Sequence, residues 1–241
     1  MTPSILAATY AFRGLCEVAE NDLMKLRIHY GQEFFSKNTA KIAGNRLVPK
    51  KPNSEQQMTA QPKPGSTTPG GVILPYKGEL PQFGTDVFIA PNAVVIGRVE
   101  LGDRANVWFN CLIRGDGNYI QIGSETNVQD GTIIHIATDR FPTIIGQRVT
   151  IGHGAVIHAC TVEDDSMIGI GAIVLDGAVV ERGAIVAAGA VVSPGKRVPA
   201  GEMWAGCPAK FQRAVKPSET EFIARNARNY CETAATYRAA L

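Results

Sequence analysis

The 241-residue sequence contains little charge and no long apolar run. Asp, Glu, Lys and Arg together make up 19% of the residues, and the formal net charge is only +2. Binding to nucleic-acid phosphates requires a strongly basic face, which this balance does not supply. No apolar segment reaches the roughly 18 residues that a membrane-spanning helix needs. The sequence therefore predicts neither a nucleic-acid partner nor a membrane-spanning helix.

The cysteines form no CxxC pair, and their number is odd. The five positions are widely separated: Cys16, Cys111, Cys160, Cys207 and Cys231. This pattern indicates free thiols in a reducing compartment rather than a disulfide framework or a thiolate zinc site. We expect each cysteine to serve as a small buried apolar residue.

The first 75 residues differ in pattern from the rest of the chain. Between Ala11 and Phe34, apolar residues recur every three or four positions, which predicts an amphipathic helical extension over residues 1–47. Three interpretations of this helix stay open: packing on its own domain, docking on a partner or peripherally on a membrane surface, or a mitochondrial presequence. Residues 48–75 are rich in Pro, Gly and Ser, which predicts an extended linker arm.

A six-residue repeat over residues 85–206 is the strongest pattern in the sequence, and it defines a predicted domain of residues 76–213. Large apolar residues recur every six positions in several frames, and from Val162 to Trp204 the repeat is unbroken. A small residue usually follows four positions later, and Gly often follows the apolar residue directly. Period six fits neither an α-helix nor simple strand alternation. A β-sandwich with coincidental spacing is the alternative.

We interpret each repeat as a short strand followed by a sharp turn. The aliphatic residue points inward, the small residue fills the corner, and Gly adopts strained backbone angles. Three repeats close a triangular coil of about 18 residues, and stacked coils form an all-β solenoid of parallel strands. After Pro217, apolar residues line one side of a predicted C-terminal helix within residues 214–241, with Ser218 and Glu221 as a capping box.

Three of the four histidines lie within one short segment of the repeat region. His135 follows inward Ile134, and His158 follows inward Ile157, so both point outward from the same position of a coil. They are 23 residues apart, which equals one coil plus about five residues that the frame break at 136–143 accommodates. We therefore expect the two imidazoles to stack one rung apart, at roughly 4.8 Å between strands.

His153 follows inward Ile151 by two positions and belongs to a neighbouring face or corner. One chain is not expected to bring all three imidazoles to one tetrahedral centre, whereas a threefold assembly of parallel prisms brings His153 to the pair on the next chain. Three neutral imidazoles and an open fourth position are typical of a catalytic zinc site. Three unrelated surface histidines are the alternative.

The segments WFNCLIRGDGNYIQIGSETNVQDGTIIH and PTIIGQRVTIGHGAVIHAC resemble the γ-class carbonic anhydrases, with a match over roughly residues 80–215. The resemblance implies a left-handed parallel β-helix in which His135, His153 and His158 bind Zn²⁺, with Fe²⁺ or Co²⁺ as alternatives. It also implies CO2 and bicarbonate as substrates. The family's interface Arg and Asp correspond to Arg114 and Asp116, which we expect to pair across subunits rather than take part in the chemistry. The family's active-site Gln corresponds to Gln129, and Asn127 and Asp130 complete the matching NxQD string.

A narrower resemblance joins the N-terminal FRGLCEVAEND, the segment GEMWAGCPAKFQR and the C-terminal ARNARNY to the γ-carbonic anhydrase subunits of mitochondrial complex I in plants and algae. It implies a homo- or heterotrimer with other subunits of this type. It further implies attachment to membrane-arm subunits of complex I, on the matrix side of the mitochondrial inner membrane, with a role in assembly.

Two features of the sequence bear on activity. The loop after His135 carries one acid, Asp139, and Gly117 follows Asp116, so groups that accept the proton from the hydration reaction are scarce. We expect weak CO2 hydration, or hydration that depends on a neighbouring subunit. A free homotrimeric carbonic anhydrase and a hexapeptide-repeat acyltransferase with a catalytic histidine remain the alternative functions.

Overall fold

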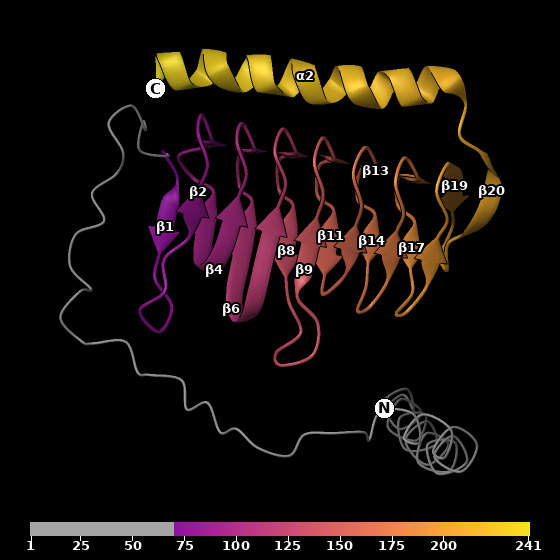
Figure 1. Ribbon diagram of the computed structural model, residues 1–241, viewed down its shortest axis with the longest axis horizontal. Helices are drawn as coiled ribbons and strands as arrows, with labels where there is room; N and C mark the ends of the chain where they lie inside the picture. The colour runs from indigo at the N-terminus through magenta and orange to yellow at the C-terminus, as the bar shows by residue number, and fades with distance from the viewer. Residues whose placement is uncertain (1–69) are drawn as a thin grey trace, which may run out of the picture. The chain divides into compact units, whose positions relative to one another are not determined.

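The computed structural model describes residues 70–241, which form a parallel β-solenoid of about seven coils followed by one helix (Figure 1). This arrangement confirms the predicted all-β core and C-terminal helix. The expected N-terminal helix at 1–47 and residues 48–69 of the expected linker arm lie outside the described residues. Strand pairing begins at Val72, inside the range predicted as linker, because β1 adds to the first coil alongside β4.

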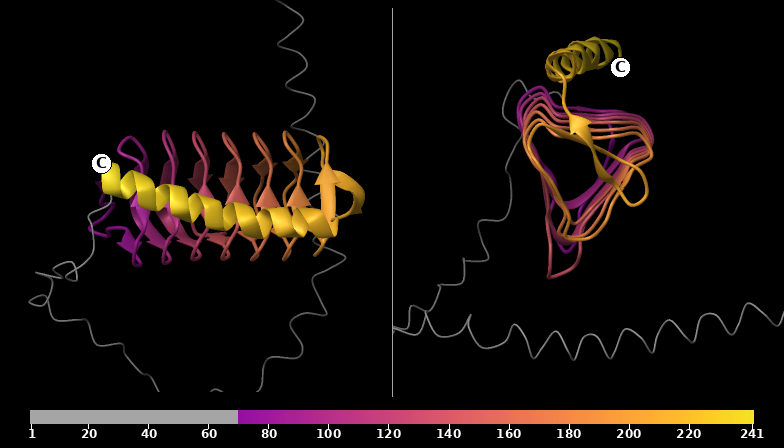
Figure 2. Two further views of the ribbon diagram at one scale, coloured as in Figure 1. Left: turned by 90° about the horizontal axis from the view of Figure 1, so that it is seen from above. Right: turned by 90° about the vertical axis from the view of Figure 1, so that its right-hand side faces the viewer.

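The solenoid has three faces, and its cross-section is triangular (Figure 2). The helix face contains β3 (Phe88–Ile89), β5 (Asn106–Val107), β7 (Asn127–Val128), β10 (Thr150–Ile151), β13 (Met167–Ile168), β16 (Ile185–Val186), β19 (Glu202–Ala205) and the antiparallel β20 (Lys210–Ala214). The open face contains β1 (Val72–Leu74), the first halves of β4 (Val94–Leu101) and β6 (Leu112–Ile122), β8 (Ile133–His135), β11 (Val156–His158), β14 (Ile173–Val174) and β17 (Val191–Val192). The third face contains β2 (Gln82–Phe83), the second halves of β4 and β6, β9 (Thr143–Ile145), β12 (Thr161–Val162), β15 (Val179–Val180) and β18 (Arg197–Val198).

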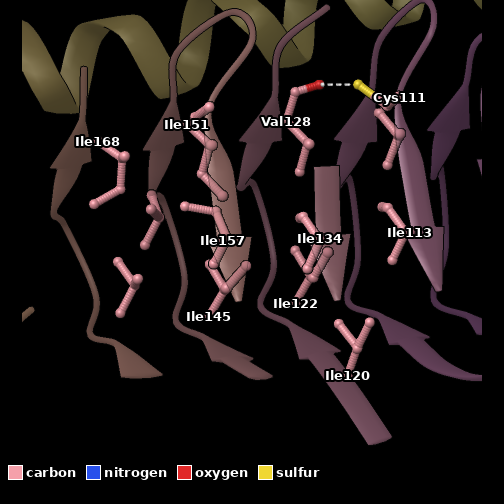
Figure 3. Packing of buried hydrophobic residues seen from close by; sticks show 14 of the residues in the cluster. Cys111, Ile113, Ile120, Ile122, Val128, Ile134, Ile145, Ile151, Ile157 and Ile168 are labelled. Carbon is pink, nitrogen blue, oxygen red and sulfur yellow. Dashed lines mark hydrogen bonds between the residues drawn. The ribbon is translucent and has the colours of Figure 1, made fainter. Parts of the chain in front are cut away.

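The core consists of aliphatic columns that run along the solenoid axis (Figure 3). Ile134 and Ile157 are register partners on adjacent strands, and both are completely buried. The residues predicted to point inward from Val162 to Val198 are also buried. Trp204 is only half-buried, because it lies on β19 near the end of the stack.

Small residues fill the corners as predicted, and two of them are cysteines. Cys111 and Cys160 are buried, and burial raises the pKa of their thiols to about 11 and about 12. Both thiols are therefore protonated and unreactive near neutral pH. Cys231 is half-buried and Cys207 is exposed, which contradicts the expected burial at that position, because Cys207 lies in the turn between β19 and β20. Cys16 lies outside the described residues.

The glycines that directly follow inward residues have a different role from the one predicted. Gly146 does not have a positive φ; instead, a Cβ at this position would lie 2.5 Å from the backbone nitrogen of Asp164 in the next coil. Gly123 and Gly152 are confined in the same way by the coils that follow them. The left-handed angles occur at other glycines, such as Gly183, where φ is 67° and no atom crowds the Cβ position. Close approach between coils therefore explains the Ile-Gly pattern.

The helix α2 (Pro217–Ala240) lies along the helix face and covers it (Figure 2). Its 24 residues correspond to about 36 Å, close to the roughly 34 Å of seven stacked rungs. Tyr230 and Tyr237 pack edge-on against Trp108, with ring centroids 5.3 and 5.4 Å apart. In the described part of the chain, no helix combines the length and apolar character of a membrane span.

The start of α2 differs from the predicted capping box. Ser218 lies inside the helix, because Pro217 occupies the first helical position and its fixed φ favours a start there. The carboxylate of Glu219 accepts the backbone N–H of Lys216 at 2.9 Å and pairs with Arg213 at 2.8 Å. The hydrogen bond from Arg213 and that from Lys216 lower the pKa of Glu219 to about 2. At the other end of α2, Arg238 pairs with Asp86 of the first coil.

We predict that Gly146→Ala lowers the free energy of unfolding by about 3 kcal/mol, because the added methyl group forces two coils apart. Gly183→Ala is the matched control and costs only about 1–2 kcal/mol for a left-handed alanine. Urea denaturation of both variants measures the difference. Equal losses of stability would show that close approach at Gly146 is unimportant.

We also predict that Glu219→Gln lowers the stability of the protein at neutral pH by about 1 kcal/mol, the scale of helix-capping interactions. A lowered folded pKa contributes stability above the unfolded pKa of about 4.3, and this contribution disappears as pH falls toward 2. The difference between wild type and variant should therefore shrink over that range in thermal melts. Glu221→Gln, at an exposed position on the same helical turn, should show no such difference.

Candidate metal centre

His135 and His158 lie on adjacent strands of the open face, at the corner next to the third face. They end β8 and β11, and the parallel register pairs them directly. The loop between β8 and β9 holds the residues beyond one coil length, and it is the long protruding loop in Figure 1. The predicted stacking of these two imidazoles is therefore confirmed.

The two rings face each other through nitrogen atoms. His135 Nδ1 lies 3.2 Å from His158 Nε2. The opposite nitrogens contact carboxylates: His135 Nε2 lies 3.1 Å from Asp116 Oδ1, and His158 Nδ1 lies 2.6 Å from Asp176 Oδ1. An ionised carboxylate accepts a hydrogen bond from an imidazole N–H, so in a neutral ring the outer nitrogen carries the N–H and the facing nitrogen presents a lone pair.

This arrangement fits a bound metal ion. The facing nitrogens of two neutral rings are 3.2 Å apart, and their lone pairs repel each other unless a proton or a metal cation lies between them. Tetrahedral zinc with Zn–N bonds of 2.0–2.1 Å separates two ligand nitrogens by about 3.3 Å. Neutral imidazole is also a preferred ligand of zinc, iron and cobalt. The observed spacing and the carboxylate contacts match a pair of metal ligands.

His153 lies on the other edge of the open face, in the turn between β10 and β11. Its Nδ1 contacts Asp130 Oδ2 at 2.9 Å, which leaves Nε2 as the lone pair, and its side chain is 46% exposed. Within residues 70–241 of one chain, no three His, Cys, Asp or Glu side chains are grouped to hold a metal ion. This separation agrees with the expectation that one chain does not assemble the site.

Arg114 and Asp116 lie one coil before His135. They form an ion pair within the chain, so Asp116 contacts both Arg114 and His135. Burial raises the pKa of Asp116, but the hydrogen bonds from His135 and Arg114 outweigh it, and the pKa lies below its ordinary value. Pairing of Arg114 and Asp116 across subunits stays a prediction.

A shallow pocket of about 350 Å³ adjoins this ion pair. Its lining includes Tyr76, Glu79, Arg98, Arg114, His135 and Asp139. Asp139 therefore reaches the pocket beside His135, and Glu79 adds a second acid that the sequence analysis missed. Glu79 comes from a short hairpin outside the repeat, where the six-residue frame makes no prediction about side-chain direction.

Gln129 and Asn127 lie near the corner that carries His153. Gln129 Nε2 donates to Asn127 Oδ1 at 3.0 Å, and Asn127 Nδ2 donates to Thr150 Oγ1 at 3.0 Å. Asn226 of α2 donates to the same hydroxyl at 3.1 Å. Asn127 is completely buried beneath α2, so it orients Gln129 rather than facing a substrate. The amide oxygen of Gln129 is left as an acceptor.

Asp176 was also absent from the sequence prediction, although the spacing contained a signal. It lies 18 residues after His158, which is one coil length. It also follows inward Val174 by two positions, near the same corner of the solenoid. A search for acids one coil away from each histidine would have found it.

Comparisons with known proteins agree with this geometry. Residues 160–194 match a family of hexapeptide repeats of succinyl-transferase. The chain is 49% identical over 159 residues to gamma carbonic anhydrase 2, mitochondrial, of Arabidopsis thaliana, covering 64% of this chain and 57% of the relative. It is 45% identical to a probable carbonic anhydrase of Methanocaldococcus jannaschii, covering 64% of this chain and 97% of the relative.

A crystal structure of a hexapeptide transferase family protein from Anaplasma phagocytophilum is also similar. It has 42% sequence identity and a TM-score of 0.66, covering 69% of this chain and 98% of that one. The chain spans between 57% and 62% of the length of the Arabidopsis relatives that it matches. It spans nearly all of the archaeal relative, and its repeat, register and paired imidazoles are consistent with that match. The chain belongs to the γ-carbonic anhydrase family.

Proposed function

We propose that this protein is a zinc-dependent γ-carbonic anhydrase subunit whose metal site is shared between neighbouring chains of a trimer. The observation that carries the proposal is the pair of facing nitrogens on His135 and His158, whose outer nitrogens contact carboxylates. This pair supplies two ligands, and His153 of an adjoining chain supplies the third. The separation of His153 from the pair within one chain supports a shared site.

The open face is suited to contact between chains. Its outward positions between the two histidine-bearing corners are all aliphatic: Val94, Leu112, Ile133, Val156, Ile173 and Val191. Of these, Ile133 is 43% exposed. The third face instead exposes polar residues such as Glu100, Gln121 and Arg197. Burial of the aliphatic column provides a driving force for assembly, and a closed threefold ring uses this surface in every chain.

The residues around the site have separate roles in the proposed hydration of CO2 to bicarbonate. His135, His158 and His153 of an adjoining chain would hold the zinc, which would supply a nucleophile derived from water at neutral pH. The amide oxygen of Gln129 accepts a hydrogen bond and orients the reacting group. Asp139 and Glu79 line the pocket beside His135 and accept the released proton. Glu79 also pairs with Arg98 at 3.1 Å, so groups that accept the proton are few and we expect weak activity.

We further propose that the chain acts within mitochondrial respiratory complex I, in a homo- or heterotrimer on the matrix side of the membrane arm. The similarity to the Arabidopsis protein named mitochondrial supports the compartment. The resemblance of the terminal segments to complex I subunits supports the attachment and a role in assembly. In this proposal the N-terminal segment contacts membrane-arm subunits or the lipid surface.

Acyl transfer is the second candidate, because the matched crystal structure belongs to a protein named as a hexapeptide transferase. An acyltransferase needs one basic histidine beside an acyl-donor groove. It has no use for two imidazoles that point lone pairs at each other. The paired geometry therefore favours metal-dependent hydration.

Subunit complementation tests the shared site. We predict that trimers of His153→Ala alone and trimers of His158→Ala alone bind no zinc, because every site lacks a ligand. Mixed trimers of the two variants should recover about one zinc per trimer, because one interface joins an intact His158 to an intact His153. Differently tagged chains allow the mixed trimers to be purified, and elemental analysis with a CO2 hydration assay measures recovery.

The control in this experiment is a mixture of two differently tagged His153→Ala chains, which should remain free of zinc. Zinc retained in that control, or no recovery in the mixed trimers, would contradict the shared site. Recovery of zinc without CO2 hydration would contradict the catalytic role and leave a metal-binding scaffold. Transfer of acetyl groups from acetyl-CoA by the zinc-free protein would favour the second candidate.

The complex I assignment has its own test. We predict that the tagged full-length chain comigrates with NADH dehydrogenase activity on native gels of mitochondrial membranes. It should also be degraded by protease only after the inner membrane is opened, because the proposed site faces the matrix. Migration as a free trimer would contradict attachment and support the homotrimeric enzyme instead.

A further inference from the structure

The carboxylate of Asp176 contacts a histidine at short range. Its Oδ1 lies 2.6 Å from His158 Nδ1, the shortest of the three contacts between a histidine and a carboxylate in residues 70–241. Two further carboxylates of the solenoid pair with arginine instead: Asp165 with Arg148 and Arg182, and Glu181 with Arg197. Among the contacts of residues 70–241, the Asp176 side chain pairs with His158 and with no cation.

The backbone of Asp176 contributes to the fold independently of its side chain. Its carbonyl accepts the N–H of Gly195 in the following coil at 2.8 Å. The side chain is 38% exposed and fills no part of the core. Replacing the carboxylate should therefore leave the stacking of coils intact, so a structural explanation for its position is weak.

The contact determines the state of the imidazole. An imidazole that donates from Nδ1 to a carboxylate presents Nε2 as its lone pair, in a fixed ring orientation. That Nε2 is the atom facing His135 Nδ1 at 3.2 Å. A neighbouring carboxylate also makes the ring a stronger ligand, and such partners change metal affinity by about 10- to 100-fold.

We propose that Asp176 is a positioning residue of the metal centre, which holds His158 in the tautomer and orientation that bind the ion. The proposal rests on the proposed metal site. Asp176 belongs to the coil after His158, while Asp116 supports His135 from the coil before it. Asp116 and Asp176 thus hold the two histidines from opposite directions along the solenoid axis, and the four residues come from four successive coils.

The test compares three variants in the full chain loaded with Zn²⁺ or Co²⁺. Asp176→Ala should release metal to a chelator about 10- to 100-fold faster than wild type, and the visible spectrum of its Co²⁺ form should change. Asp176→Asn keeps an oxygen acceptor without the charge, so its rate of metal release should lie between those of wild type and Asp176→Ala. Asp165→Asn is the control, since Asp165 pairs with arginines and asparagine tolerates its left-handed φ of 58°.

The outcomes separate this proposal from the proposed function. If wild type binds no metal, both fail. If wild type binds metal and Asp176→Ala releases it at the wild-type rate with an unchanged Co²⁺ spectrum, only the role of Asp176 is overturned. If Asp165→Asn loses metal as readily as Asp176→Asn, loss of any corner carboxylate weakens the site, and the specific role is also overturned. Metal loss restricted to the Asp176 variants, with melting temperatures like that of the control, supports the proposal.

Discussion

The parallel hydrogen-bond register between coils is the constraint on which the rest of this structure depends. Backbone bonds such as Ile133 N–H to Ala155 O at 2.9 Å, and Ala159 N–H to His135 O at 3.0 Å, lock each coil onto the next. Side chains at equivalent positions then form columns about 4.8 Å apart. A shift of one residue would turn His158 into the core and bring Ile157 to the surface. The register therefore determines where the two imidazoles lie. Glycines such as Gly146 make this register possible, because a side chain at that position would hold adjacent coils apart.

The proposed metal centre is consequently a property of a column rather than of one loop. Asp116, His135, His158 and Asp176 come from four successive coils and meet at one corner. Each coil contributes one group, and the backbone ladder sets the distance between them. The chain can thus hold a rigid donor set without taking any of these four groups from the long loop after β8, which contributes Asp139 to the adjoining pocket. Helix α2 supports the opposite corner in the same way, because Asn226, Thr150 and Asn127 connect it to Gln129.

Much of the fold and half of the site could be predicted from the sequence, because period six identifies both the inward residues and the outward histidines. Ile134 and Ile157 are spaced so that their neighbours, His135 and His158, must stack. The sequence prediction failed where a contact depends on distances between coils or on local geometry, which the six-residue period does not specify. The role of Gly146 depends on how close the next coil approaches, and the start of α2 depends on Pro217. Glu79 lies outside the repeat, so the period gives no direction for its side chain. The period also does not show that Arg114 pairs with Asp116 within the chain. Asp176 was predictable in principle, because it lies one coil length beyond His158.

In the proposed site, the division of ligands between two corners would link metal binding to assembly. A straight prism cannot bend His153 around its own open face to meet His135 and His158, so a site built from all three histidines requires a second chain. A ligand that binds only the assembled state stabilises that state by mass action, and zinc would therefore strengthen the trimer as the trimer completes the zinc site. In a mixed trimer, each chain supplies the pair to one interface and His153 to the other. A chain that lacks one ligand then spoils a single site and leaves the aliphatic contacts in place. Under the proposed function, this asymmetry would allow a trimer to keep a scaffold role while losing part of its catalytic capacity.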